Sequence, residues 1–226
     1  MRRRKEAGLA RVLRSATVLR VSVLELPARW GRSEEALAEA DALLASGPTD
    51  LAVVPEMSLS GYVSPRGDFD LRRFAEPIDG PTVRAVADLC RRHRAYLVAP
   101  LVLAEGARVY NVAVVVDPGG EVVATYRKRH PWFPETWASP GLAPAPVVPI
   151  GDLRVTFAIC FDAQFLLEES PAALHQADLL VFTSAWVDEL DSRVPLLRSL
   201  TARFGVAVAN ANWGEGAVVV PGQGGS

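Results

Sequence analysis

Three side chains that could together carry out acyl transfer each come directly after an apolar segment of the sequence. Glu56 follows "AVVP", Lys128 follows "VVATYR" and Cys160 follows "VTFAI". In layered α/β proteins, residues beyond the carboxyl ends of strands gather at one edge and form the ligand site. A thiol can attack an acyl carbon, a carboxylate can take the thiol proton, and an ammonium can stabilise the charge that develops on the carbonyl oxygen. The pattern therefore predicts an acyl-transfer site.

Each of the three residues also has an explanation that involves no chemistry. Glu56 could cap a turn, and Lys128 lies in the basic run "RKR", which could be a solvated surface segment. Cys160 ends a strand that is apolar on both faces, and free cysteines are among the most buried residues. The occurrence of three reactive side chains at equivalent positions favours the chemical interpretation over three separate structural ones.

The elements that must position these residues alternate between strands and helices. Apolar runs predict strands at residues 17–26, 50–55, 95–103, 109–117, 121–128, 155–159, 178–186 and 205–212. Helical periodicity predicts helices at residues 34–46, 81–94 and 193–204. Ser33 is the expected N-cap of the first helix, and Cys90 falls on the apolar side of the second. Glycine-containing turns should join the strands between residues 95 and 128 into antiparallel pairs, so we expect a mixed α/β layered domain.

Composition indicates a protein that acts on small molecules. The chain of 226 residues is 50% hydrophobic and has a net charge of −2, so it can build a large core and has no electrostatic reason to bind nucleic acid or an anionic membrane. No stretch approaches the roughly 20 apolar residues of a membrane span, and two cysteines are too few for a disulfide framework. We expect a cytoplasmic protein with a basic tail at residues 1–16 and a single domain at residues 17–226.

Three segments resemble the signature regions of the nitrilase superfamily of carbon-nitrogen hydrolases. They are "VVPEMSLSGY" at residues 53–62, "YRKRHPWFPE" at 126–135 and "ICFDAQF" at 159–165. The resemblance covers nearly the whole chain and implies a four-layer α-β-β-α sandwich. The segment "LLVFTSAWVDELDSRVPLL" is most similar to the biotinidase and vanin branch, whose members act on linear secondary amides. The chain ends where relatives continue into further strands, so we expect either a truncated sequence or a sheet that lacks its last strands.

The resemblance implies a role for each residue, with no cofactor and no metal. Cys160 would be the nucleophile of a thioester mechanism, Glu56 its general base and then acid, and Lys128 with the backbone N–H of Phe161 would stabilise the oxyanion. Glu135 matches a second glutamate that holds the lysine, although a surface acid in a loop is the alternative. The implied function is hydrolysis of a linear amide. Two alternatives stay open: an inactive family member that serves as a binding or scaffold protein, and an acyltransferase that passes the thioester to an amine.

Aromatic residues beside the motifs are candidates for substrate contact. Tyr62, Trp132, Phe161 and Trp186 could line the pocket, although aromatic residues in such loops are nearly as often packing residues. Asp162 is expected to fix the local turn by accepting backbone N–H groups. The expected partners are therefore a small amide and, depending on the C-terminal region, a second copy of the chain in a homodimer.

Other polar residues have weaker interpretations. Asn210 and Asn212, at a strand end, could bind substrate or neighbouring backbone. The three histidines, His93, His130 and His175, lack the spacing of metal ligands, so no metal site is predicted. Replacement of the nucleophile, the base or the lysine should remove turnover and leave the melting temperature near that of the wild type.

Overall fold

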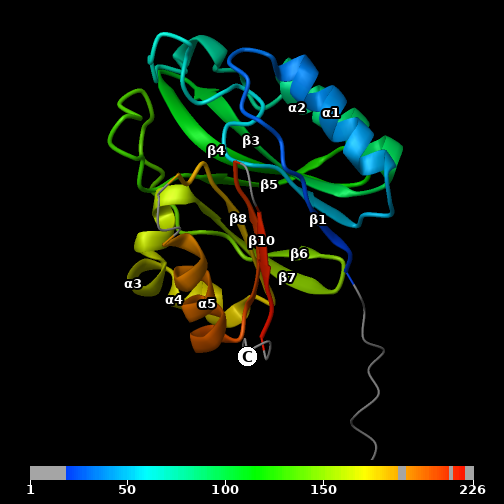
Figure 1. The fold of residues 1–226 in the computed structure, drawn as a ribbon, viewed down its shortest axis with the longest axis vertical. Coiled ribbons are helices and arrows are strands. Elements are labelled where there is room, and N and C mark those ends of the chain that lie inside the picture. The colour runs from blue at the N-terminus through cyan, green and yellow to red at the C-terminus, as the bar shows by residue number, and fades with distance from the viewer. Residues whose placement is uncertain (1–18, 188–191, 214–215, 222–226) are drawn as a thin grey trace, which may run out of the picture.

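Two five-stranded sheets stack face to face in the computed structural model, which describes residues 19–187, 192–213 and 216–221. Helices cover the outer face of each sheet (Figure 1). This arrangement is the four-layer α-β-β-α sandwich, so the fold class expected from the sequence is confirmed. The predicted basic tail, residues 1–16, lies outside the described residues.

The first sheet has the strand order β1-β2-β3-β4-β5. Its strands are β1 (Val21–Val23), β2 (Leu51–Val53), β3 (Tyr96–Glu105), β4 (Arg108–Val116) and β5 (Val122–Arg127). β1, β2 and β3 run parallel, whereas β3, β4 and β5 form the antiparallel pairs that the turns predicted. The strand predicted at residues 17–26 begins outside the described residues, which start at 19. Over residues 19–26 its length is wrong, because β1 is an edge strand that pairs with β2 over three residues.

The second sheet has the order β10-β9-β8-β7-β6. Its strands are β6 (Val148–Ile150), β7 (Leu153–Ile159), β8 (Leu179–Thr183), β9 (Ala207–Ala211) and β10 (Ala217–Val219). The three central strands run parallel, and β6 and β10 are antiparallel to them at the two edges. Residues 155–159 of β7 are all buried, as expected for a strand that is covered on both faces.

Two groups of helices form the outer layers. α1 (Ser33–Ala45) and α2 (Pro81–His93) lie side by side on the first sheet, and α3 (Leu166–Glu169), α4 (Pro171–Gln176) and α5 (Arg193–Phe204) cover the second (Figure 1). The expected cap at Ser33 is wrong, because α1 begins at that residue and the N-cap position belongs to Arg32, with no side-chain capping bond. Within the described ranges, no helix is long and apolar enough to cross a membrane.

Apolar side chains of both sheets fill the layer between them. Val53 and Val98 of the first sheet belong to the same buried cluster as Val155 and Phe157 of the second. A further cluster lies between the first sheet and its helices and includes Cys90, so the predicted core position of this cysteine is confirmed. Burial raises the pKa of the Cys90 thiol to about 12. This thiol therefore stays protonated and enclosed.

Candidate active site

Three strand ends bring the predicted trio together at one edge of the sandwich. Glu56 lies three residues beyond β2, Lys128 directly follows β5, and Cys160 directly follows β7. Glu56 and Lys128 come from the first sheet and Cys160 comes from the second. The candidate site therefore lies where the two sheets meet, and its parts are assembled by their packing.

Glu56, Lys128 and Glu135 form a buried group that we call the charge cluster. The ammonium of Lys128 donates to Oε1 of Glu56 and to Oε1 of Glu135, at 2.8 Å in each case. None of the three side chains is more than 1% exposed, which excludes the alternative of a surface acid at Glu135. Because a lysine ammonium carries three hydrogens, these two bonds leave one for a further acceptor.

Neutral donors hold both carboxylates of the charge cluster. Asn111, in β4, donates through Nδ2 to Oε1 of Glu56 at 2.8 Å and to Oε1 of Glu135 at 3.3 Å. The hydroxyl of Tyr62 donates to Oε1 of Glu135 at 2.8 Å. The backbone N–H of Ala185 donates to Oε2 of Glu56 at 3.1 Å. The orientation of each carboxylate is therefore fixed from several sides.

Burial and charge oppose each other in the charge cluster. Burial alone would lower the pKa of Lys128, but the carboxylates of Glu56 and Glu135 outweigh it and raise the pKa above its ordinary value. Lys128 is therefore a cation at neutral pH. Burial raises the pKa of Glu135, against the opposing charge of Lys128. A carboxylate with a raised pKa is a better proton acceptor near neutral pH.

Cys160 has a backbone conformation that residues other than glycine rarely adopt. β7 ends at Ile159, and a short 3₁₀ helix (Cys160–Gln164) begins with a φ of 45° at Cys160. This left-handed conformation costs free energy for a residue with a Cβ atom and is frequent at functional sites. The turn leaves Cys160 half-buried in the wall of a pocket, which contradicts the alternative that it only fills the core.

The thiol of Cys160 is protonated in the resting site. Burial raises its pKa well above the ordinary value, and the negative charge of Glu56 raises it further. Lys128 and the N–H of Ala185 lower the pKa by less. Since the thiolate is the reactive form, attack by this thiol must be coupled to loss of its proton.

A pocket of about 190 Å³ has Cys160 in its wall. The four aromatic residues predicted to contact substrate, Tyr62, Trp132, Phe161 and Trp186, all line this pocket. The rest of its described wall consists of Gln164, Ala185 and Val187. Among these described residues no side chain carries a formal charge. The pocket is smaller than the roughly 300–1,000 Å³ of sites for drug-sized ligands, so it suits a compact neutral group.

Asn210 and Asn212 bond to the chain itself behind this pocket. Asn212 accepts the N–H of Trp186 at 2.8 Å and donates to the carbonyl of Trp186 at 3.1 Å. Asn210 donates to the carbonyl of Phe182 at 2.9 Å. Of the two expectations for these residues, the backbone contacts are therefore present, and Asn212 fixes the segment that carries Trp186.

Asp162 ties the end of β7 to the first sheet. Its Oδ1 atom accepts the backbone N–H groups of Arg129 and His130, at 3.1 and 2.9 Å. Its Oδ2 atom accepts the hydroxyl of Tyr126 at 2.8 Å and the N–H of Ile159 at 3.3 Å. The expectation that Asp162 fixes a turn through backbone N–H groups is confirmed. The bonds to Arg129 and His130 show that it also holds the segment that follows β5.

We expect Asp162→Ala to lower the free energy of unfolding by about 2–3 kcal/mol, because the substitution removes the acceptor of four donors, two of them buried and two half-buried. In a protein of this size the loss corresponds to a fall in Tm of roughly 4–12 °C. Thr156→Val is the matched control, because Thr156 is buried in β7 and its hydroxyl has no partner among the described residues. Thermal unfolding of both variants is the measurement. Equal Tm values for the two variants would contradict the role of Asp162.

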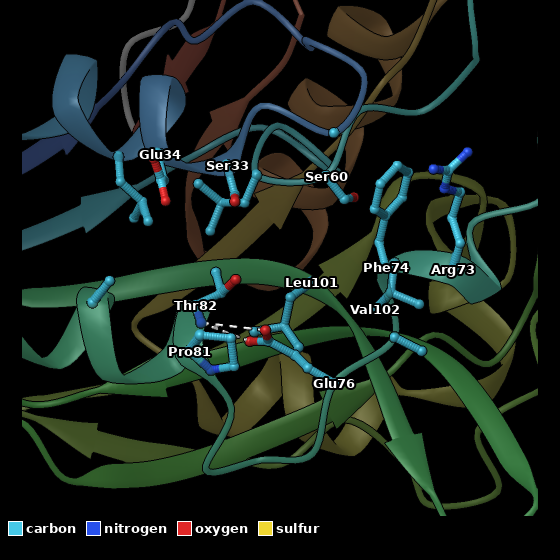
Figure 2. Close-up of a pocket in the computed structure, with 15 residues that line it drawn as sticks. Ser33, Glu34, Ser60, Arg73, Phe74, Glu76, Pro81, Thr82, Leu101 and Val102 are labelled. Atoms are coloured by element: carbon cyan, nitrogen blue, oxygen red, sulfur yellow. Dashed lines mark hydrogen bonds between the residues drawn. The ribbon is translucent and has the colours of Figure 1, made fainter.

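A larger cavity, of about 490 Å³, lies apart from the charge cluster. Figure 2 shows it between the first turns of α1 and α2, with Ser33 and Glu34 on one side and Pro81 and Thr82 on the other. Glu76 in its wall accepts the backbone N–H of Thr82 at 3.0 Å and so caps α2. The described wall contains no cysteine, lysine or histidine. This cavity therefore adds no thiol, amine or imidazole to the candidate site.

The sequence did not reveal every group that shapes the site. Asn111 carries a usable signal, because it is a polar residue inside the apolar run "VYNVAVVV" and a buried amide must find partners. The backbone N–H of Ala185 carries no such signal, because every residue except proline has one. Among residues 19–187, 192–213 and 216–221, no group of three histidine, cysteine or acidic side chains is arranged to hold a metal ion.

Comparison with known proteins identifies the class to which this fold and site belong. The sequence matches the carbon-nitrogen hydrolase family over residues 14–213, and the chain belongs to this family. The predicted nitrilase superfamily is thereby confirmed. A solved mutant of the Nesterenkonia AN1 amidase from the nitrilase superfamily is 26% identical, with a TM-score of 0.76 over 89% of this chain and 79% of that one.

Two curated relatives are amidases by name. The "(R)-stereoselective amidase" of a Pseudomonas species is 32% identical over 175 residues, which cover 75% of this chain and 61% of that protein. The "Formamidase" of Bacillus cereus (strain G9842) is 29% identical over 147 residues, which cover 64% of this chain and 44% of that protein. The chain thus spans less than two thirds of the length of these relatives.

Proposed function

We propose that this protein hydrolyses small linear amides through a thioester on Cys160. The observation that carries the proposal is the charge cluster of Glu56, Lys128 and Glu135 beside a half-buried thiol, in a pocket whose described wall has no formally charged side chain. The thiol needs a proton acceptor and the carbonyl oxygen needs a cation, and this arrangement supplies both away from water. The similarity to amidases and a formamidase supports the same chemistry.

Acylation begins when the sulfur of Cys160 attacks the amide carbon. Glu56 takes the thiol proton as the C–S bond forms, and the electron pair of the carbonyl double bond moves onto the oxygen. When the oxygen returns this pair, the C–N bond breaks and Glu56 gives its proton to the nitrogen. Ammonia or an amine leaves, and the acyl group remains on Cys160 as a thioester.

Deacylation uses the same groups with water as the nucleophile. Glu56 takes a proton from water as the water oxygen attacks the thioester carbon. The C–S bond then breaks, and the sulfur of Cys160 recovers the proton that Glu56 holds. A carboxylic acid is released, and the site returns to its resting state. Glu135 holds Lys128 throughout, and its raised pKa lets it assist as a proton acceptor.

Lys128 stabilises the carbonyl oxygen in both halves of the reaction. Its ammonium is charged and enclosed, and the hydrogen that Glu56 and Glu135 leave unused is available to the oxyanion. The backbone N–H of Phe161 is the second donor. Loss of a single oxyanion donor typically slows a reaction by about 10²- to 10³-fold, so the assignment has a measurable consequence.

The pocket favours compact, neutral acyl groups. Half of the residues in its described wall are aromatic, and its volume of about 190 Å³ leaves room for a few heavy atoms beside the thiol. Short aliphatic amides meet these conditions. Longer conjugates, such as those of the biotinidase and vanin branch, would extend beyond the pocket, and membership in that branch stays a prediction.

A screen of linear amides tests the proposed function. Formamide, short aliphatic amides, N-carbamoyl compounds and pantetheine-like conjugates are incubated with the protein, and released ammonia or amine is measured with Cys160→Ala as the blank. We expect turnover of at least one compact neutral amide and none in the blank. No release from any compound would favour the inactive scaffold. Transfer to an amine acceptor without free acid would favour the acyltransferase.

Iodoacetamide should alkylate Cys160 in the native protein and spare Cys90. Cys160 lines the pocket and has Glu56 beside it, whereas Cys90 is buried in the core with a pKa of about 12. We expect labelling at Cys160 to be at least about tenfold faster, as measured by mass spectrometry of peptides. Denatured protein is the control, because both thiols should then react alike. Equal labelling of the two thiols in the native protein, or none, would argue against an activated nucleophile.

A further inference from the structure

We propose that Asn111 is a positioning residue whose side-chain amide holds the two carboxylates of the charge cluster in their working geometry. The inference rests on the amide hydrolysis proposed above and assigns a further residue to it. Asn111 lies inside β4, is 0% exposed and touches neither the pocket nor the thiol among the described contacts. Its effect must therefore pass through the residues that it bonds.

Four atoms close a ring in which donors and acceptors alternate. Nζ of Lys128 lies 2.8 Å from Oε1 of Glu56 and 2.8 Å from Oε1 of Glu135. Nδ2 of Asn111 completes the ring, at 2.8 and 3.3 Å from the same two oxygens. Two donor nitrogens thus separate two negatively charged oxygens. Among the described bonds, removal of the amide leaves Lys128 as the single side chain that spans both carboxylates.

Only the donor end of the Asn111 amide has partners. Its Oδ1 atom has no hydrogen-bond partner among the described residues, although the side chain is fully buried. An unpaired buried acceptor destabilises a fold, so the oxygen of this amide gives no stabilising contact that would explain an amide at this position. The amide supplies one thing that an apolar side chain lacks, which is a pair of N–H groups directed at Glu56 and Glu135.

The backbone of Asn111 bonds to the third member of the charge cluster. Its carbonyl accepts the N–H of Lys128 at 2.8 Å, directly after β5 ends. One residue therefore contacts the base, the backbone of the lysine and the second carboxylate. Because Oε1 of Glu56 is held by Asn111 and Lys128, the direction of the other oxygen, Oε2, depends on both. A misplacement of about 1 Å can cost about 10²-fold in rate.

Two substitutions separate this role from simple packing. Asn111→Leu removes the donor and keeps the bulk, whereas Asn111→Asp keeps the shape and replaces the donor with an acceptor. We expect both to lower kcat per titrated active site by about 10- to 100-fold. This is the loss that typically follows when a residue that hydrogen-bonds to a metal ligand is removed, and Asn111 supports Glu56 and Glu135 in the same way. KM should stay within about twofold, because Asn111 does not touch the substrate. Asn111→Asp should be at least as impaired as Asn111→Leu.

Val112→Ala is the matched control, because Val112 is the next residue of β4 and points into the core beneath α1 and α2. It should lower Tm and leave kcat unchanged. If the wild type is active and Asn111→Leu keeps its kcat within about twofold, this inference fails and the proposed function stands. A much milder effect of Asn111→Asp than of Asn111→Leu would also overturn it, because shape would then matter more than donation. A wild type that cleaves no amide overturns both proposals. If Asn111→Leu does not fold, Asn111→Ala takes its place with the same expected loss.

Discussion

Glu56→Gln should abolish amide turnover and at the same time make Cys160 easier to deprotonate. Turnover should fall by about 10³- to 10⁴-fold, because the thiol loses its proton acceptor and the leaving nitrogen loses its proton donor. The negative charge of Glu56 raises the pKa of Cys160 and the positive charge of Lys128 lowers it. Removal of the Glu56 charge leaves the effect of Lys128, so the pKa of the thiol should fall.

The two effects of Glu56→Gln are measured separately. Product release gives turnover, and the rate of iodoacetamide labelling at Cys160 between pH 6 and 10 gives the titration of the thiol. Labelling should persist in Glu56→Gln, and its midpoint should lie at lower pH than in the wild type. Glu169→Gln is a control, since Glu169 is a surface carboxylate paired with Arg129 and His130. A labelling midpoint that moves to higher pH would contradict the assignment of Glu56 as the group that keeps Cys160 protonated.

Lys128→Met should remove turnover and destabilise the protein. Loss of the oxyanion cation should cost about 10²- to 10³-fold in kcat. The substitution also leaves two carboxylates buried without their countercharge, which typically costs about 3–5 kcal/mol. The fall in Tm should be roughly 6–20 °C for a protein of this size. Thermal unfolding and amide turnover of the same preparation measure both effects.

A double variant separates chemistry from stability at Lys128. Lys128→Met/Glu135→Gln removes one negative charge along with the positive one, so part of the lost Tm should return. Turnover should not return, because the cation is still missing. Retention of most activity in Lys128→Met would show that the oxyanion role is wrong. An unchanged Tm in the single variant would mean that the buried ion pairs of Lys128 do not stabilise the fold.

The fold was predictable from the sequence wherever a local pattern determines an element. Pro81 and the apolar side that contains Cys90 were sufficient to predict α2. The glycine turn at 117–120 was sufficient to predict the hairpin of β4 and β5. The length of β1 was not predictable, because it depends on how far its neighbour in the sheet extends. The cap of α1 was wrong, because Ser33 lies inside the helix and does not cap it.

The candidate site was predictable in its residue types and not in its contacts. Reactive side chains after apolar strands pointed to Glu56, Lys128 and Cys160, and the family resemblance added Glu135. Lys128 bridges two carboxylates, and this contact depends on how the folded chain brings the three side chains together, which the sequence does not show. The sequence therefore led to an expectation of unchanged stability at Lys128 that its burial does not support. The homodimer and the cytoplasmic location stay predictions.

The proposed base and nucleophile belong to different sheets, so the packing between the sheets determines the distance between them as well as the stability of the fold. Glu56 extends from the first sheet and Cys160 from the second, so their separation is set by how the two sheets slide on each other. Side chains such as Val53 and Val155 in the layer between the sheets fix that alignment. Substitutions there that keep hydrophobicity but alter shape could yield a folded protein with little activity. Packing far from the substrate would then limit the reaction rate as well as the stability.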